Sequence, residues 1–195
     1  MARFQFRNSG LTGERCTLLF RSVFAARMQL LTSWMRGELC AEEVVRFIAS
    51  EIGADSDELF AGLVESCRRM TFVSDELPEL IRRLRETGTK VVIATDNMDT
   101  FTRWTIPALG LGDLFDDILD SHSLRALKQD STPEGESAFF GRYMAKEGLS
   151  PEECLLVDDS MQTVAAVEGF GINVLKVKKG QNLVKALSAL LWHQT

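Results

Sequence analysis

The chain has 195 residues, a hydrophobic fraction of 45%, a charged fraction of 26% and a net charge of −6. These values are ordinary for one globular domain, or for one domain with a modest insertion. The basic residues are scattered and the pI is about 5.1, so neither nucleic acid nor an anionic membrane surface is expected as a partner.

The cysteines point to a reducing compartment. Their spacing shows no pairs, and they lie within apolar patterns, at Cys16, Cys40, Cys67 and Cys154. We therefore expect buried, reduced thiols and a cytoplasmic protein. Residues 1–7 are not typical of a signal peptide, and no uncharged apolar run approaches the ~20 residues of a membrane span.

Residues from about Glu14 to Met70 are expected to be helical. Apolar side chains recur there at steps of three or four, first at Leu18, Leu19, Phe24, Met28, Leu31 and Met35, and then at Val44, Val45, Phe47, Ile48 and Ile52. Gly53 is a suitable residue to end the second of these helices, and Asp55 with Glu58 resembles a capping box that begins a third.

From Thr71 onward the pattern predicts alternating helices and strands. Ser74 and Pro78 begin a helix that Gly88 ends. The following elements are a strand ending at Thr95, a helix with Phe101 and Trp104, a short strand at 117–119, a helix from Pro133 to Gly148, a strand ending at Asp158, a helix from Ser160, a strand at 172–177 and a last helix.

Apolar strands interleaved with helices predict a parallel sheet covered on both faces. The expected fold class is α/β, with a Rossmann-like parallel sheet and an N-terminal helical cap. We place the helical cap region at residues 1–71 and the α/β core at residues 72–195.

Polar residues follow the predicted strands at the edge where open parallel sheets carry their sites. Thr95, Asp96 and Asn97 follow one strand, Asp158 and Asp159 end another, and Lys128 lies in a loop between them. A hydroxyl, a lysine and paired carboxylates can hold phosphate oxygens, neutralise their charge and bind Mg²⁺.

Each residue also has a simpler interpretation. Thr95-Asp96 could cap a helix, Lys128 could be a surface residue, and Asp158-Asp159 could cap the next helix. Their joint order and their placement at strand ends favour a shared site. A response-regulator receiver domain uses similar residues, but there the acid pair comes first, so this class is excluded.

This order closely resembles the haloacid dehalogenase-like hydrolase superfamily, whose members are mostly phosphatases. Thr95 resembles its second motif, which binds the phosphoryl group, and Lys128 resembles its third, although Gln129 stands where proline is frequent. Residues 157–160, with the downstream turn at 169–171, resemble the fourth motif, whose acids Asp158 and Asp159 hold Mg²⁺. Residues 36–45 resemble the helical cap that many members insert.

The chain departs from the family at the first motif, an apolar central strand ending in Asp-x-Asp that supplies the nucleophile. No Asp precedes Asp55, and residues 4–9 have only a faint similarity, with Gln5 and Arg7 in place of the acids. A missing amino-terminal strand is the preferred explanation, and a diverged, non-catalytic member is the rival.

The resemblance implies a phosphatase for a small phosphorylated metabolite, inactive as the chain stands, with Thr95 and Lys128 catalytic, Asp96 and Asn97 substrate-binding, and weakly bound Mg²⁺. The alternative is a binding or regulatory protein. The double Asp favours phosphoryl transfer over halide displacement. Without a central strand, exposed strand edges should favour aggregation or dimerisation. A homo-oligomer is therefore one expected state of the chain.

Overall fold

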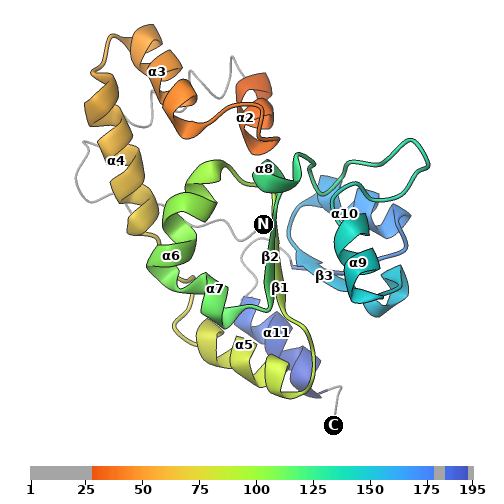
Figure 1. The fold of residues 1–195 in the computed structure, drawn as a ribbon. Coiled ribbons are helices and arrows are strands. Elements are labelled where there is room, and N and C mark those ends of the chain that lie inside the picture. Colours follow the sequence, from red (N-terminus) through yellow and green to blue (C-terminus); the bar gives the residue numbers. More distant parts are fainter. Residues whose placement is uncertain (1–27, 178–182, 193–195) are drawn as a thin grey trace.

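Three helices begin the described part of the chain in the computed structural model, which describes residues 28–177 and 183–192 (Figure 1). They are α2 (Met28–Met35), α3 (Ala41–Ile52) and α4 (Ser56–Arg68). The helical prediction is confirmed for this part of the chain. The earlier stripe residues Leu18, Leu19 and Phe24 lie outside the described residues.

The three helices bury an apolar cluster against the rest of the chain. Trp34, Ala41 and Val44 are buried, and Phe60 and Trp104 pack against them with their rings edge to face at 5.6 Å. The predicted stripes are wrong at two positions, Met28 and Ile52, and Ile52 is 38% exposed at the end of α3. Met28 is 62% exposed because it begins α2, and Trp34, outside the predicted stripe, is the buried residue of this helix.

The predicted end of α3 and the predicted start of α4 are confirmed, although only the Asp55 half of the expected capping box with Glu58 forms. Gly53 follows α3 in the left-handed conformation with φ 66°, which glycine adopts without steric cost. The Asp55 carboxylate then accepts the backbone N–H of Glu58 at 2.8 Å and so caps α4.

Four short strands form two parallel pairs. β1 (Val92–Thr95) pairs with β2 (Asp117–Asp120), with Thr95 opposite Asp120. β3 (Leu155–Asp158) pairs with β4 (Asn173–Lys176), with Asp158 opposite Lys176. Each predicted strand is therefore present and ends within two residues of its expected position.

The two pairs share one core. Leu119 of β2, Leu156 of β3, Phe139 and Val167 belong to a single buried cluster, and Val92 packs on it. Among the described residues no strand joins β1 to β3. The expected parallel α/β architecture is thus present, a Rossmann-like fold with helices on both faces (Figure 1).

The remaining helices flank the strands. α5 (Leu77–Glu86) packs on α11 (Leu183–Trp192) through Leu77, Leu80 and Val184. The others are the π-helix η1 (Phe101–Thr105), α6 (Ile106–Leu109), α7 (Leu111–Leu114), α8 (Ser121–Leu124), α9 (Gly141–Glu147), the 3₁₀ turn η2 (Pro151–Glu153) and α10 (Met161–Gly169).

The helix predicted from Pro133 begins later. Residues 130–138 instead form a turn in which Ser131 bridges Ser137 in antiparallel fashion, and α9 starts at Gly141. Thr132 N–H donates to Glu136 C=O at 2.8 Å, and Ala138 N–H donates to Asp130 C=O at 2.9 Å. These bonds occupy groups that a helix would need, so the proline begins a loop rather than a helix.

The cysteine prediction holds in part. Cys40, Cys67 and Cys154 are free thiols, but only Cys67 is buried and the other two are half-buried; Cys16 lies outside the described residues. No helix in the described part of the chain is long and apolar enough to cross a membrane.

Candidate functional site

The predicted residues meet at the carboxyl ends of the strands. Thr95 is the last residue of β1, and Asp158 is the last residue of β3. The strands are parallel within each pair, and Lys128 contacts both Asp96, which directly follows β1, and Asp158, so these two strand ends lie close together.

Lys128 connects the two strand pairs. Its side chain is 1% exposed, and its Nζ forms an ion pair with Asp158 Oδ2. Its backbone N–H donates to Asp96 Oδ1 at 2.9 Å. The lysine from the loop after β2 therefore touches the residue that follows β1 and the residue that ends β3. Its interpretation as a surface residue is wrong.

The lysine determines the ionisation of Asp158. Burial acts to raise the pKa of Asp158, but the hydrogen bond and positive charge of Lys128, with the N–H of Ser160, hold that pKa below its usual value. Burial raises the pKa of Asp96, and the Lys128 N–H and charge offset this only in part. Asp158 is therefore the carboxylate that pairs with the lysine.

Asn97 is held by a serine that the sequence analysis did not single out. Asn97 N–H donates to Ser121 Oγ at 2.9 Å, and the Ser121 hydroxyl donates back to Asn97 C=O at 3.1 Å. Ser121 is fully buried and directly follows β2. Its position immediately after an apolar strand is the signal that could have identified it.

The acid pair separates into two environments. Asp158 is buried at 2% exposure, whereas Asp159 is half-buried. Neither aspartate is the cap of α10. Ser160 caps this helix, since its Oγ accepts the N–H of Thr163 at 3.4 Å.

The described side chains do not by themselves fit Mg²⁺. This ion prefers octahedral oxygen ligation, usually from one or two carboxylates with water and phosphate. Asp158 already accepts bonds from Lys128 at one oxygen and from the Ser160 N–H, at 2.8 Å, at the other. Within the described residues no group of three or more His, Cys, Asp or Glu side chains could hold a metal.

The single Asp-x-Asp pattern in the sequence, Asp55-Ser56-Asp57, does not supply a nucleophile. It follows no apolar strand, and both acids are exposed at the start of α4, where Asp55 serves as the cap.

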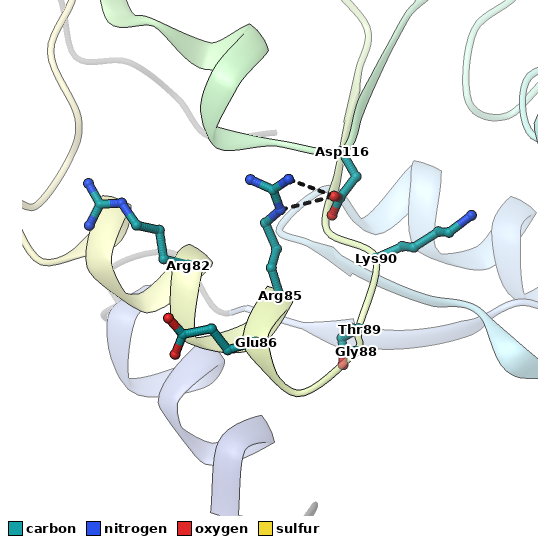
Figure 2. Close-up of a pocket in the computed structure, with 7 residues that line it drawn as sticks. All are labelled: Arg82, Arg85, Glu86, Gly88, Thr89, Lys90 and Asp116. Atoms are coloured by element: carbon teal, nitrogen blue, oxygen red, sulfur yellow. Dashed lines mark hydrogen bonds and ion pairs between the residues drawn. The ribbon is translucent and has the colours of Figure 1, made fainter.

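A polar cavity of about 440 Å³ lies at the opposite end of β1, lined by Arg82, Arg85, Glu86, Gly88, Thr89, Lys90 and Asp116 (Figure 2). Figure 2 shows Arg85 directed at Asp116 and the heads of Arg82 and Lys90 pointing away from each other. Their charges are already paired, Arg82 with Glu79 and Lys90 with Glu147. Because it lies at the end of β1 opposite to Thr95, the cavity is separate from the strand-end site.

The family model described as haloacid dehalogenase-like hydrolase matches residues 26–171, and the chain belongs to this family. No curated protein matches the sequence significantly.

Solved structures of this family share the fold at low identity. An aspartate-to-alanine variant of a family enzyme from Bacteroides thetaiotaomicron, in complex with magnesium and inorganic phosphate, is 18% identical, with a TM-score of 0.69 over 91% of this chain and 92% of its own. A predicted family hydrolase from Porphyromonas gingivalis is 20% identical, with a TM-score of 0.66 over 92% and 90%.

Dehalogenases are also among the similar structures. The L-2-haloacid dehalogenase of Xanthobacter autotrophicus, with chloropropionic acid covalently bound, is 19% identical and has a TM-score of 0.60, over 91% of this chain and 71% of its own. At identities of 18–20% these comparisons show the fold, and they do not identify the substrate.

Proposed function

We propose that the strand-end crevice binds the phosphoryl group of a small phosphorylated metabolite, in the manner of a family phosphatase. The observation that carries the proposal is the position of Lys128, which pairs with Asp158 and bonds to Asp96 in one place. The similar Bacteroides enzyme was crystallised with inorganic phosphate and magnesium, which supports this substrate class.

Each residue has a role in this proposal. The Thr95 hydroxyl donates to a phosphoryl oxygen, and the buried Lys128 ammonium neutralises its charge in a site of low dielectric. One carboxylate oxygen of Asp96 accepts the Lys128 backbone N–H, and this bond stabilises the turn around the lysine. Asn97, anchored by Ser121, orients the loop that follows Thr95.

Magnesium enters the proposal only as a weakly bound ion at Asp158 and Asp159. Because Asp158 is engaged by Lys128 and Ser160, binding a metal there requires these contacts to change.

The chain as it stands is proposed to bind phosphate without turning it over. A covalent route needs a carboxylate nucleophile opposite Thr95 and Lys128, and no Asp precedes Asp55. In other covalent hydrolases, removing the nucleophile costs on the order of 10⁶ in turnover. The same observation favours the second candidate, a non-catalytic binding or regulatory protein that uses the crevice for phosphate ligands.

The test measures binding and turnover on the same protein. We expect inorganic phosphate to bind the wild-type chain in calorimetry and not to bind Lys128→Ala. We expect no hydrolysis of an aryl phosphate above background with Mg²⁺ present. Robust hydrolysis by the purified chain would mean that another residue is the nucleophile, and absence of phosphate binding would overturn the site.

An extended chain separates the two candidates. If an apolar strand ending in Asp-x-Asp is fused before Met1, the phosphatase proposal expects Mg²⁺-dependent turnover that Lys128→Ala and Asp158→Asn abolish. Phosphate binding without any gain of turnover would favour the binding protein.

A further inference from the structure

The connection between α2 and α3 (residues 36–40, the α2–α3 connection) and the helix residues next to it contact the loop that follows β1 and the helix α8 that follows β2. On the β1 side, the buried Asp99 accepts the Trp34 indole N–H at 2.6 Å and the Ala41 backbone N–H at 3.2 Å. On the β2 side, His122 Nε2 lies 3.2 Å from the Leu39 carbonyl oxygen. The connection is therefore fixed on the side of the fold that carries Lys128.

Arg36 makes the contact closest to the lysine. Its guanidinium binds Asp130 with both terminal nitrogens, one of them 2.8 Å from Asp130 Oδ1. The two side chains are 32% and 19% exposed. A two-point pair between a guanidinium and a carboxylate fixes orientation as well as distance.

Asp130 also closes the turn that contains Lys128. Its Oδ2 accepts the Leu127 N–H at 2.8 Å, and its own N–H donates to the Leu127 carbonyl at 2.9 Å. The carboxylate oxygen that accepts the Leu127 N–H also faces Arg36. Lys128 lies within this turn, and its ammonium pairs with Asp158.

We propose that Arg36 is a positioning residue for Lys128, acting through Asp130. The inference rests on the proposed function, because the role of Lys128 in holding phosphate comes from there. In this proposal, the position of the Lys128 ammonium depends on where the α2–α3 connection packs. Helices α2–α4 are therefore coupled to the strand-end site.

Gly37 gives independent support for this coupling. It has φ +69°, and a Cβ built there would lie 2.4 Å from the backbone oxygen of His122. The connection thus lies directly against helix α8, with no room for a side chain at Gly37. Gly53 has φ +66° and nothing within 4 Å of such a Cβ, which makes it a matched control with the same backbone strain.

The first experiment measures the affinity of the full chain for inorganic phosphate by calorimetry. We expect Arg36→Ala to weaken binding about tenfold, as the loss of a charge-assisted contact would, and Arg36→Lys to recover part of the loss. Arg82→Ala is the control, since Arg82 forms an exposed pair with Glu79 at the other end of the fold and should leave binding unchanged.

Asp130→Ala distinguishes positioning from simple charge. Removing a negative charge near the site would strengthen phosphate binding if only the net charge mattered. The proposal expects Asp130→Ala to weaken binding, and expects Arg36→Ala to add nothing further in the Asp130→Ala background. Stronger phosphate binding by Asp130→Ala, or full additivity of the two substitutions, would overturn the inference.

The second experiment needs no ligand and follows amide hydrogen exchange at Leu127 and Lys128 in the full chain. Exchange should be faster in Arg36→Ala and Gly37→Ala and unchanged in Arg82→Ala and Gly53→Ala. If the wild-type chain binds no phosphate, the proposed function fails while this measurement still tests the coupling. Unchanged exchange at Leu127 in Arg36→Ala would overturn the coupling whatever the chain binds.

Discussion

At the scale of single residues, the Lys128–Asp158 pair is the most completely buried ion pair among the described residues, with both side chains 1% exposed. Removing one partner of a buried pair leaves an unpaired charge in a medium of low dielectric. We predict that Asp158→Asn lowers the free energy of unfolding by about 3–5 kcal/mol, measured by denaturant titration.

Two further variants check the cause of this loss. Glu79→Gln breaks an exposed pair with Arg82, in which both side chains are more than half exposed, and should cost less than about 1 kcal/mol. Lys128→Met combined with Asp158→Asn removes both charges and should recover part of the stability. A double variant as unstable as Asp158→Asn alone would show that the unpaired lysine is not the cause.

Glu42 provides a residue-scale prediction about pH. The side-chain hydrogen bonds of Arg103 hold the pKa of Glu42 at about 2, below its ordinary 4.5. Since the folded-state pKa is depressed, the pair stabilises the protein above pH 4.5 and loses this contribution as the pH falls toward 2. Glu42 is 41% exposed, so solvent screening limits the effect to less than about 1 kcal/mol.

The measurement is the difference in unfolding free energy between wild type and Glu42→Gln across this pH range. We expect the wild type to be more stable at neutral pH and the difference to shrink as Glu42 is protonated. Glu43→Gln is not a neutral control, because Glu43 accepts the Cys40 N–H at 2.8 Å; Glu134→Gln, at an exposed position of the 130–138 turn, serves as the control. An unchanged difference down to pH 2 would contradict the assigned pair.

At the scale of elements, the edges of β1 and β3 that face away from their partners lead to a prediction about self-association. Within residues 28–177 and 183–192, β1 pairs only with β2 and β3 only with β4, and all four residues of β1 are half-buried. Open apolar edges favour pairing with another chain. We predict concentration-dependent self-association, measured by light scattering coupled to size exclusion. A monodisperse monomer with a high, cooperative melting transition would contradict it.

At the scale of the whole molecule, helices α2–α4 and the α/β elements meet through polar bridges as well as apolar contacts. Arg103 of η1 binds Glu42 of α3 and lies 4.3 Å from the Trp104 ring centroid, and Arg36 binds Asp130 on the other side. These two ion pairs thus join helices α2–α4 to the segments that follow β1 and β2.

The metal prediction belongs to this scale because Mg²⁺ would need ligands from several elements. We predict weak Mg²⁺ binding, which calorimetry at millimolar concentrations should detect and Asp158→Asn should reduce, with the exposed Asp57→Asn as control. Tight binding that survives Asp158→Asn would show that the ion binds elsewhere.

Much of the site could be predicted from the sequence because parallel strands deliver their last residues to one edge. Thr95 and Asp158 end apolar runs, and both are strand ends in the structure. The caps Gly53 and Asp55 were predictable for the same reason, since their effect is local and depends on neighbours within a few residues.

Only the tertiary structure decided which of these groups touch. The burial of Lys128, its bond to Asp96 and the link from Arg36 through Asp130 join residues far apart in the sequence, and no local pattern encodes such contacts. The loop after Pro133 is similar, because its backbone bonds to Asp130 compete with the helix that the apolar spacing predicts. Sequence by itself determined the strand ends and their chemistry through periodicity and local capping, whereas long-range packing and the desolvation of charge decided the pairing around Lys128.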